Sequence, residues 1–156
     1  MKTIKAKFRV RRIEARDESR WRRLWDAYTR FYEREPSESV TQCTWKRIMN
    51  PDSPVHAIVA ESVRGEVLGI ANYTIQENTS LITPSCYLSD LIVDADYRGL
   101  GVGRLLMNWL VTEMKRQGWA RVYWHTRENN YRARALYDKF TPHSGFLRYV
   151  IENTSV

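Results

Sequence analysis

Residues 87–104 read YLSDLIVDADYRGLGVGR, a strand-like segment followed directly by a glycine-rich turn. After the turn, apolar residues recur at helical spacing up to Gln117-Gly118, namely Leu105, Leu106, Trp109, Leu110 and Met114. Alternate glycines allow backbone N–H groups to approach an anion closely, and the helix N-terminus that follows favours negative charge. The order strand, turn, helix therefore favours a pyrophosphate site, although glycines alone support a flexible turn about equally well. The spacing fits neither the dinucleotide fingerprint nor a nucleotide-triphosphate loop.

The flanking segments predict the rest of the fold. Period-two alternation indicates a strand over 5–12, and an aromatic stripe from Trp21 to Tyr32 indicates a helix over 17–34. Further elements are expected as a helix over 41–49, strands over 56–61, 66–76 and 85–93 with a turn at Arg64-Gly65, a strand over 121–126, a helix over 130–139 and a last strand over 146–151. This order predicts an α/β fold with a mixed sheet and helices on both faces.

Composition limits the class of protein. A chain of 156 residues that is 43% hydrophobic predicts a single domain over 1–156, with a core over about 5–152. The apolar runs are too short for a transmembrane helix, and residues 1–12 lack the apolar centre of a secretory signal. A cytoplasmic location without membrane association is expected.

Positive charge is concentrated at the N-terminus. Residues 1–23 hold ten Lys/Arg against three acids, whereas the remaining residues hold fifteen of each. The concentration favours solvated strand and helix faces over a phosphate-binding surface, so nucleic acid is not the expected partner. No metal is expected either, because Cys43 and Cys86 and the three histidines are scattered, and both cysteines are interpreted as buried core thiols.

Two motifs together resemble the GNAT superfamily of N-acetyltransferases. Arg98-Gly99-Leu100-Gly101-Val102-Gly103 is similar to its coenzyme motif, and Asn130-Tyr131-Arg132-Ala133-Arg134-Ala135-Leu136-Tyr137 is similar to its later helix. The resemblance covers essentially the whole chain and implies a single GNAT-type domain with a mixed, mostly antiparallel twisted sheet. The Trp-rich first helix and the segment 87–93 are most similar to the branch of polyamine and small-amine acetyltransferases that also includes enzymes called histone acetyltransferases. The chain departs from some relatives in having Ser89 where they carry a glutamate, and in its longer link over 140–144.

The resemblance implies acetyl-CoA as co-substrate, without a metal. Backbone groups of Leu91, Ile92 and Val93 would pair with the pantetheine arm, and one of their N–H groups would polarise the acetyl carbonyl. The pyrophosphate would be held by Arg98, Gly99, Leu100, Gly101, Val102, Gly103 and Arg104. Asn130 would bond the pantetheine arm.

The resemblance also implies the proton donor. Tyr137 would protonate the departing thiolate, a role suited to a phenol with a pKa near 10. The resemblance provides no base, because Ser89 stands where some relatives carry a glutamate. The residues themselves predict Asp90 as the base or a water relayed through Glu128 or Glu77, with a purely structural role for Asp90 as the alternative.

Several functions remain open. A small primary amine such as a polyamine is the favoured acceptor, and protein lysines or N-termini are the alternative within the family. A nucleic-acid-binding module without activity, or a coenzyme-binding sensor, would use the same fold. A homodimer is expected, because six tryptophans and nine tyrosines in so small a domain predict an aromatic-rich surface. The resemblance also implies a dimer, since similar acetyltransferases form dimers.

Overall fold

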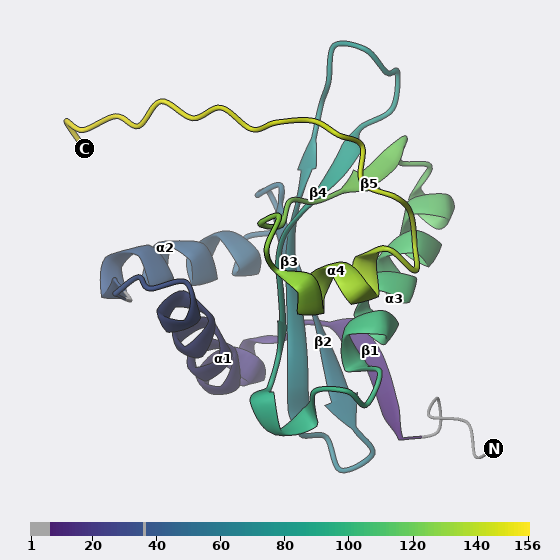
Figure 1. Cartoon of the computed structure of the whole chain (residues 1–156). Coiled ribbons are helices and arrows are strands. Elements are labelled where there is room, and N and C mark those ends of the chain that lie inside the picture. The colour runs from purple at the N-terminus through teal and green to yellow at the C-terminus, as the bar shows by residue number, and fades with distance from the viewer. Residues whose placement is uncertain (1–6, 36) are drawn as a thin grey trace. The chain divides into compact units, whose positions relative to one another are not determined.

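A five-stranded sheet in the order β1-β2-β3-β4-β5 forms the centre of the first part of the chain (Figure 1). This computed structural model describes residues 7–35 and 37–156, so residues 5 and 6 of the first predicted strand lie outside the described residues. The strands are β1 (Phe8–Arg12), β2 (Val55–Ser62), β3 (Val67–Gln76), β4 (Ser85–Val93) and β5 (Arg121–Tyr123). β1 to β4 pair antiparallel, and β5 pairs parallel to β4. The predicted mixed, mostly antiparallel sheet is confirmed.

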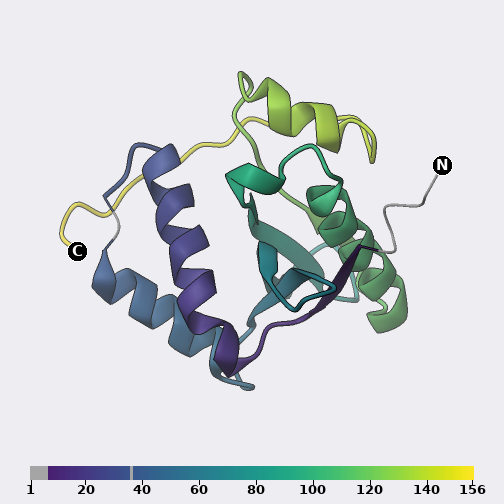
Figure 2. The same ribbon diagram turned by 90° about the horizontal axis from the view of Figure 1, so that it is seen from below.

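Helices cover both faces of this sheet (Figure 2). α1 (Glu18–Phe31) and α2 (Glu38–Met49) lie on one face, and α3 (Val102–Gln117) lies on the other. Short 3₁₀ turns, η2 (Ala15–Asp17) and η3 (Ala95–Tyr97), precede α1 and the glycine turn. Trp21 and Ile70 belong to the core under α1 and α2, whereas the ring of Tyr73 lies 6.5 Å from that of Trp109 on the α3 face.

The two helices on the first face bury only part of their apolar residues. Trp21 and Leu24 of α1 are buried, but Phe31 at the end of the predicted aromatic stripe is 64% exposed. α2 directs Thr41, Trp45 and Ile48 inward at steps of four and three residues. Cys43 lies on the opposite side of α2 and is exposed, so its interpretation as a buried thiol was wrong, whereas Cys86 is buried as predicted.

Glycines end two elements where the chain must turn. Gly65 has φ +80° in the turn between β2 and β3, and its N–H donates to the Ser62 carbonyl. Gly118, with φ +74°, ends α3 in the left-handed conformation, and its N–H bonds the Met114 carbonyl. Both turns lie where the sequence predicts them.

The first compact unit ends at His125, and the second covers Thr126–Val156. The second contains α4 (Tyr131–Tyr137), which confirms the core of the predicted helix over 130–139. None of the helices in the described ranges is long and apolar enough to cross a membrane.

The predicted last strand over 146–151 is wrong. Residues 141–150 have no regular secondary structure, and the apolar side chains of Phe146, Leu147, Tyr149 and Ile151 are exposed. The aromatic and β-branched residues of this segment favour a strand, but a strand also needs a hydrogen-bonded neighbour, and no described residue pairs with this segment. For the same reason β5 stops at Tyr123 instead of Thr126, because its ladder with β4 ends there.

Candidate active site

The glycine turn leads from η3 directly into α3. Gly99 and Gly101 have φ values of +76° and +86°, which side-chain-bearing residues rarely adopt. Gly103, in contrast, lies within the first turn of α3, where its lack of a side chain leaves the helix surface bare. The conformational requirement for glycine therefore falls on Gly99 and Gly101.

The N-terminus of α3 has the features of an anion site. Gly101 is the N-cap residue and has no side chain to bond the N–H groups of the first helical turn, which lack partners within the helix. Arg98 and Arg104 flank the turn, and both are exposed. These groups fit the pyrophosphate of a coenzyme because N–H donors and the positive end of the helix dipole lie at a turn that two cationic residues flank.

Close packing under this turn fixes its position. A Cβ atom at Gly69 of β3 would lie 2.9 Å from Val102 Cγ1 and 3.1 Å from the Ile92 carbonyl oxygen. Val102 and Leu106 are buried, at 1% and 0% exposure. The first turn of α3 thus rests on the bare backbone of β3.

The ladder between β4 and β5 ends early. Its last pair is Tyr87 with Tyr123, and no strand in the described part of the chain pairs with β4 on that side from Leu88 to Val93. Leu91, Ile92 and Val93 therefore present backbone groups along this edge, as a strand-like ligand requires. The glycine turn follows β4 after the short η3.

A β-bulge in β4 sets the direction of Asp90. Asn72 pairs with Asp90 and Tyr73 pairs with Leu88, so Ser89 has no partner in the ladder. In a regular strand Leu88 and Asp90 would share a face of the sheet. Here the extra residue directs Asp90 to the face covered by α1, with Asn72.

Asp90 is held in a chain of polar side chains. Asn72 Nδ2 donates to Asp90 Oδ2 at 3.1 Å, and Trp21 Nε1 donates to Asn72 Oδ1 at 3.1 Å. Burial raises the pKa of Asp90 to about 6, although hydrogen bonds from Asn72 and Tyr28 and the charge of Arg34 lower it part of the way. A carboxyl group with this pKa is deprotonated at neutral pH and is a stronger base than an exposed aspartate.

Sequence reasoning missed Asn72 and assigned Tyr28 only to packing. Asn72 is 2% exposed within the buried part of β3. A buried amide needs partners, so its presence between Ala71 and Tyr73 was a signal for a polar network.

The other candidate bases lie away from Asp90 or in the second unit. Glu77 follows the end of β3, five residues beyond Asn72, or about 17 Å at the rise of a strand. Glu128 belongs to the second unit, where its carbonyl accepts a hydrogen bond from Arg134. Of the predicted bases in the first unit, Asp90 is therefore the one whose carboxylate is oriented by a hydrogen-bond network, formed with Asn72 and Trp21.

Asn130 and Tyr137 occupy the two ends of α4. Asn130 is the N-cap residue, and its Oδ1 accepts from the Ala133 N–H at 3.3 Å. Its Nδ2 makes no hydrogen bond to another described residue, so this amide group keeps a donor for a ligand. Tyr137 is the last residue of α4 and is half-buried. Among the described residues, no group of three or more His, Cys, Asp or Glu could hold a metal ion.

Solved structures share this fold. A possible acetyltransferase from Clostridium difficile 630 matches with a TM-score of 0.82 and 15% identity over 94% of this chain and 98% of that one. AAC(6')-Iy in complex with the bisubstrate analogue CoA-S-monomethyl-acetylneamine matches with a TM-score of 0.78 and 15% identity, again over 94% and 98%. At such identities the likeness concerns the fold alone.

Sequence comparison identifies the family. The D-amino-acid N-acetyltransferase HPA3 of Saccharomyces cerevisiae is 30% identical over 139 residues, which are 88% of this chain and 86% of that protein. Residues 19–141 match the Acetyltransferase (GNAT) family. The chain therefore belongs to the GNAT family of acetyltransferases.

Proposed function

We propose that the protein transfers the acetyl group of acetyl-CoA to the primary amine of a small molecule, with Asp90 as the base. The observation that carries this proposal is Asp90 itself, which a hydrogen bond from Asn72 orients on β4, the strand whose other edge is paired with no described strand from Leu88 to Val93. Its raised pKa suits removal of a proton from an ammonium group or through a water. Alkylamines are mostly protonated at neutral pH, so the acceptor needs such a base before it can attack.

The coenzyme would lie along β4 and over the glycine turn. Acetyl-CoA supplies an activated acetyl group as a thioester. Backbone groups of Leu91, Ile92 and Val93 would orient the pantetheine arm, and the N-terminus of α3 with Arg98 and Arg104 would hold the pyrophosphate. A β4 N–H aimed at the acetyl oxygen would stabilise the charge that develops there.

The second unit would contribute Asn130 and Tyr137. Asn130 would bond the pantetheine arm through its side-chain amide. Tyr137 Oη would provide the proton that the leaving sulfur requires, since the pKa of a phenol is near that of a thiol.

A D-amino acid is a second candidate for the acceptor, beside the polyamine-like amines that the sequence favours. It is supported by the 30% identical relative, which is named for that activity. It is also supported by Arg34, whose charge acts on Asp90. An amino acid carries an ammonium group next to a carboxylate, so Asp90 would face the ammonium group and Arg34 the carboxylate.

A thiol-release screen tests the proposal. Acetyl-CoA is offered with polyamines, D- and L-amino acids, aminoglycosides, lysine derivatives and basic peptides, and we expect turnover with one class of small amine. The Gly101→Glu variant should lose turnover and coenzyme binding together while remaining folded, because a charged side chain would enter the phosphate site. Turnover with peptides alone would contradict a small-molecule acceptor and indicate protein acetylation. Binding of DNA without binding of acetyl-CoA would contradict an acetyltransferase and indicate a nucleic-acid-binding protein.

The Arg34→Gln variant separates the two small-molecule acceptors. If Arg34 binds a carboxylate, KM for amino acids should rise about tenfold while KM for polyamines stays unchanged. Equal effects on both classes would remove the support that Arg34 lends to an amino-acid acceptor.

A further inference from the structure

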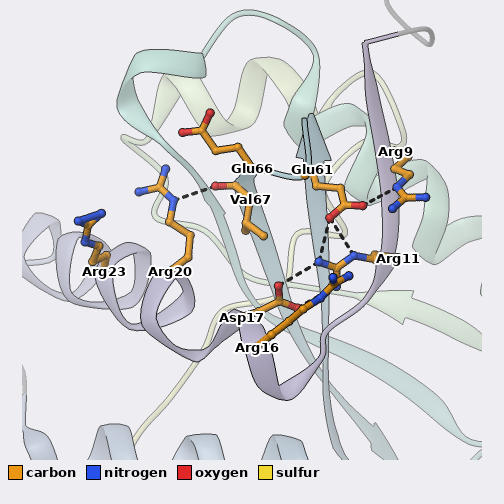
Figure 3. Close-up of a pocket in the computed structure, with 10 residues that line it drawn as sticks. Arg9, Arg11, Arg16, Asp17, Arg20, Arg23, Glu61, Glu66 and Val67 are labelled. Carbon is orange, nitrogen blue, oxygen red and sulfur yellow. Dashed lines mark hydrogen bonds and ion pairs between the residues drawn. The ribbon is translucent and has the colours of Figure 1, made fainter. Parts of the chain in front are cut away.

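A hollow of about 480 Å³ opens between β1, the beginning of α1 and the turn between β2 and β3 (Figure 3). It lies on the α1 face of the sheet and includes none of residues 98–104 of the glycine turn. Its wall contains three acidic residues and five arginines, the latter being Arg9, Arg11, Arg16, Arg20 and Arg23. The hollow is therefore separate from the proposed coenzyme site and carries an excess of positive charge.

Two of the three acids are already neutralised by arginine. Glu61 is 1% exposed and accepts hydrogen bonds from both Arg9 and Arg11. Arg11 also binds Asp17 with two nitrogens, at 2.8 and 2.9 Å. The Arg11 guanidinium holds the pKa of Glu61 below its ordinary value, so this carboxylate stays charged and paired. Figure 3 shows Glu61 and Asp17 both turned toward Arg11.

Arg20 stabilises the wall of the hollow, because two of its nitrogens are bonded to other residues. Its Nε donates to the Val67 carbonyl at 2.8 Å, and its Nη2 binds Asp94. These bonds fix α1 against the start of β3 and the end of β4. Arg11 and Arg20 are thus structural members of the site.

The three remaining arginines keep donors available. Arg9 and Arg16 each engage only Nε, with Glu61 and with Glu14, while their side chains are 72% and 66% exposed. Arg23 is exposed and forms no hydrogen bond or ion pair with another described residue. A guanidinium whose two terminal nitrogens are free can bind two oxygens of one phosphate group. Three such groups around one hollow match a ligand with several phosphate oxygens.

We propose that this hollow binds a small ligand with two or more phosphate groups. The concave shape and the limited volume fit a compact anion better than an extended nucleic-acid backbone. Glu66, exposed at the rim, is the acid that no arginine of the described residues neutralises; its carboxylate accepts a hydrogen bond from Tyr97 Oη at 3.4 Å. Its negative charge repels a bound anion, so removing this charge should strengthen binding, whereas removing an arginine should weaken it.

Calorimetric titration of the full chain with inorganic tripolyphosphate, in saturating acetyl-CoA so that the coenzyme site is occupied, tests the proposal. Each of Arg9→Gln, Arg16→Gln and Arg23→Gln should weaken binding about tenfold. Glu66→Gln should strengthen binding several-fold, because it removes a negative charge that repels the anion. Glutamine can still accept the hydrogen bond from Tyr97 Oη. Arg47→Gln, at an exposed arginine of α2 outside the hollow, is the matched control and should change nothing.

Thermal unfolding shows that each variant is folded, and acetyl transfer by the arginine variants should match wild type, which separates this proposal from the proposed function. The proposal is overturned if wild type does not bind tripolyphosphate at millimolar concentration. It is also overturned if acetyl-CoA abolishes the binding or the arginine variants retain it. A single-stranded oligonucleotide that binds more tightly than tripolyphosphate, and loses binding in the same variants, would replace the small ligand by nucleic acid.

Discussion

Asp90 and Asn72 show how environment determines the chemistry of a residue. Aspartate at an exposed strand position would be ionised far below neutral pH and would be a weak base. The bulge at Ser89 instead directs Asp90 under α1, where burial raises its pKa to about 6 and Asn72 fixes its orientation. The proposed base thus depends on one residue that carries the proton and another that holds it in place.

The Asp90→Asn variant should lose activity while gaining stability. The pKa of folded Asp90, about 6, lies above the ordinary value of 3.8. The associated stability is therefore fully present below pH 4 and is lost as the pH rises through 6. Asparagine avoids the burial of charge, so at pH 7 we expect a gain of about 1–2 kcal/mol in the free energy of unfolding, measured in urea.

The same variant gives a test of catalysis. In wild type, kcat/KM should fall as the pH drops through about 6, because protonated Asp90 cannot accept a proton. In Asp90→Asn this limb should vanish and kcat should be about 10²-fold lower at pH 8. A variant that keeps both the limb and the rate would assign the base to another group.

Tyr137 allows a test at a single atom. Tyr137→Phe removes only the hydroxyl, so kcat should fall by about 10²-fold while acetyl-CoA affinity changes little. The measurement must be made where chemistry limits the rate. A ring that merely packs would leave turnover and stability unaltered, because the phenylalanine ring has nearly the same buried area.

At the scale of elements, the contact between β3 and α3 determines where the anion site lies. The helix can supply N–H groups at the right place only if its first turn rests on β3, and that requires a position without a side chain. Gly69 meets this requirement although its own backbone is not left-handed. Its function is to permit close approach.

Gly69→Ala should therefore weaken coenzyme binding as well as stability. The new methyl group would meet Val102 and the Ile92 carbonyl, and overpacking of this kind costs about 1–3 kcal/mol. Because the first turn of α3 must shift, acetyl-CoA affinity measured by calorimetry should fall. Gly118→Ala is the control, since it strains the left-handed end of the same helix without a clash. Equal affinities in the two variants would mean that the turn does not depend on Gly69.

At the scale of the whole molecule, we predict a homodimer. The exposed apolar residues of the C-terminal segment, Phe146, Leu147, Tyr149 and Ile151, add support to the aromatic-rich composition. Apolar side chains in one run of sequence favour burial against a partner. Sedimentation at tens of micromolar, on the order of a weak dimer's dissociation constant, should show a dimer. Phe146→Ser with Ile151→Ser should yield more monomer, and a monomeric wild type would contradict the prediction.

The sequence alone predicted most of the elements, because they depend on local patterns. Helical spacing located α1, α2 and α3, alternation located β1, β-favouring residues located the strands that follow, and Gly65 and Gly118 marked turns where left-handed backbone is needed. The spacing of the glycine turn and of the segment 130–137 was sufficient to indicate the family. Each of these signals is contained within a short stretch of chain.

Only the tertiary structure decided what depends on contacts between distant residues. The residue types over 146–151 could not reveal that no described strand pairs with this segment, and no local pattern marked the bulge that directs Asp90 under α1. The free edge of β4, the packing of Gly69 against Val102 and the gathering of arginines from β1 and α1 likewise involve partners far apart in sequence. Composition indicated the positive charge of the N-terminus. It could not indicate which arginines pair with buried acids and which keep free nitrogens, because that depends on how β1, β2 and α1 fold around Glu61 and Asp17.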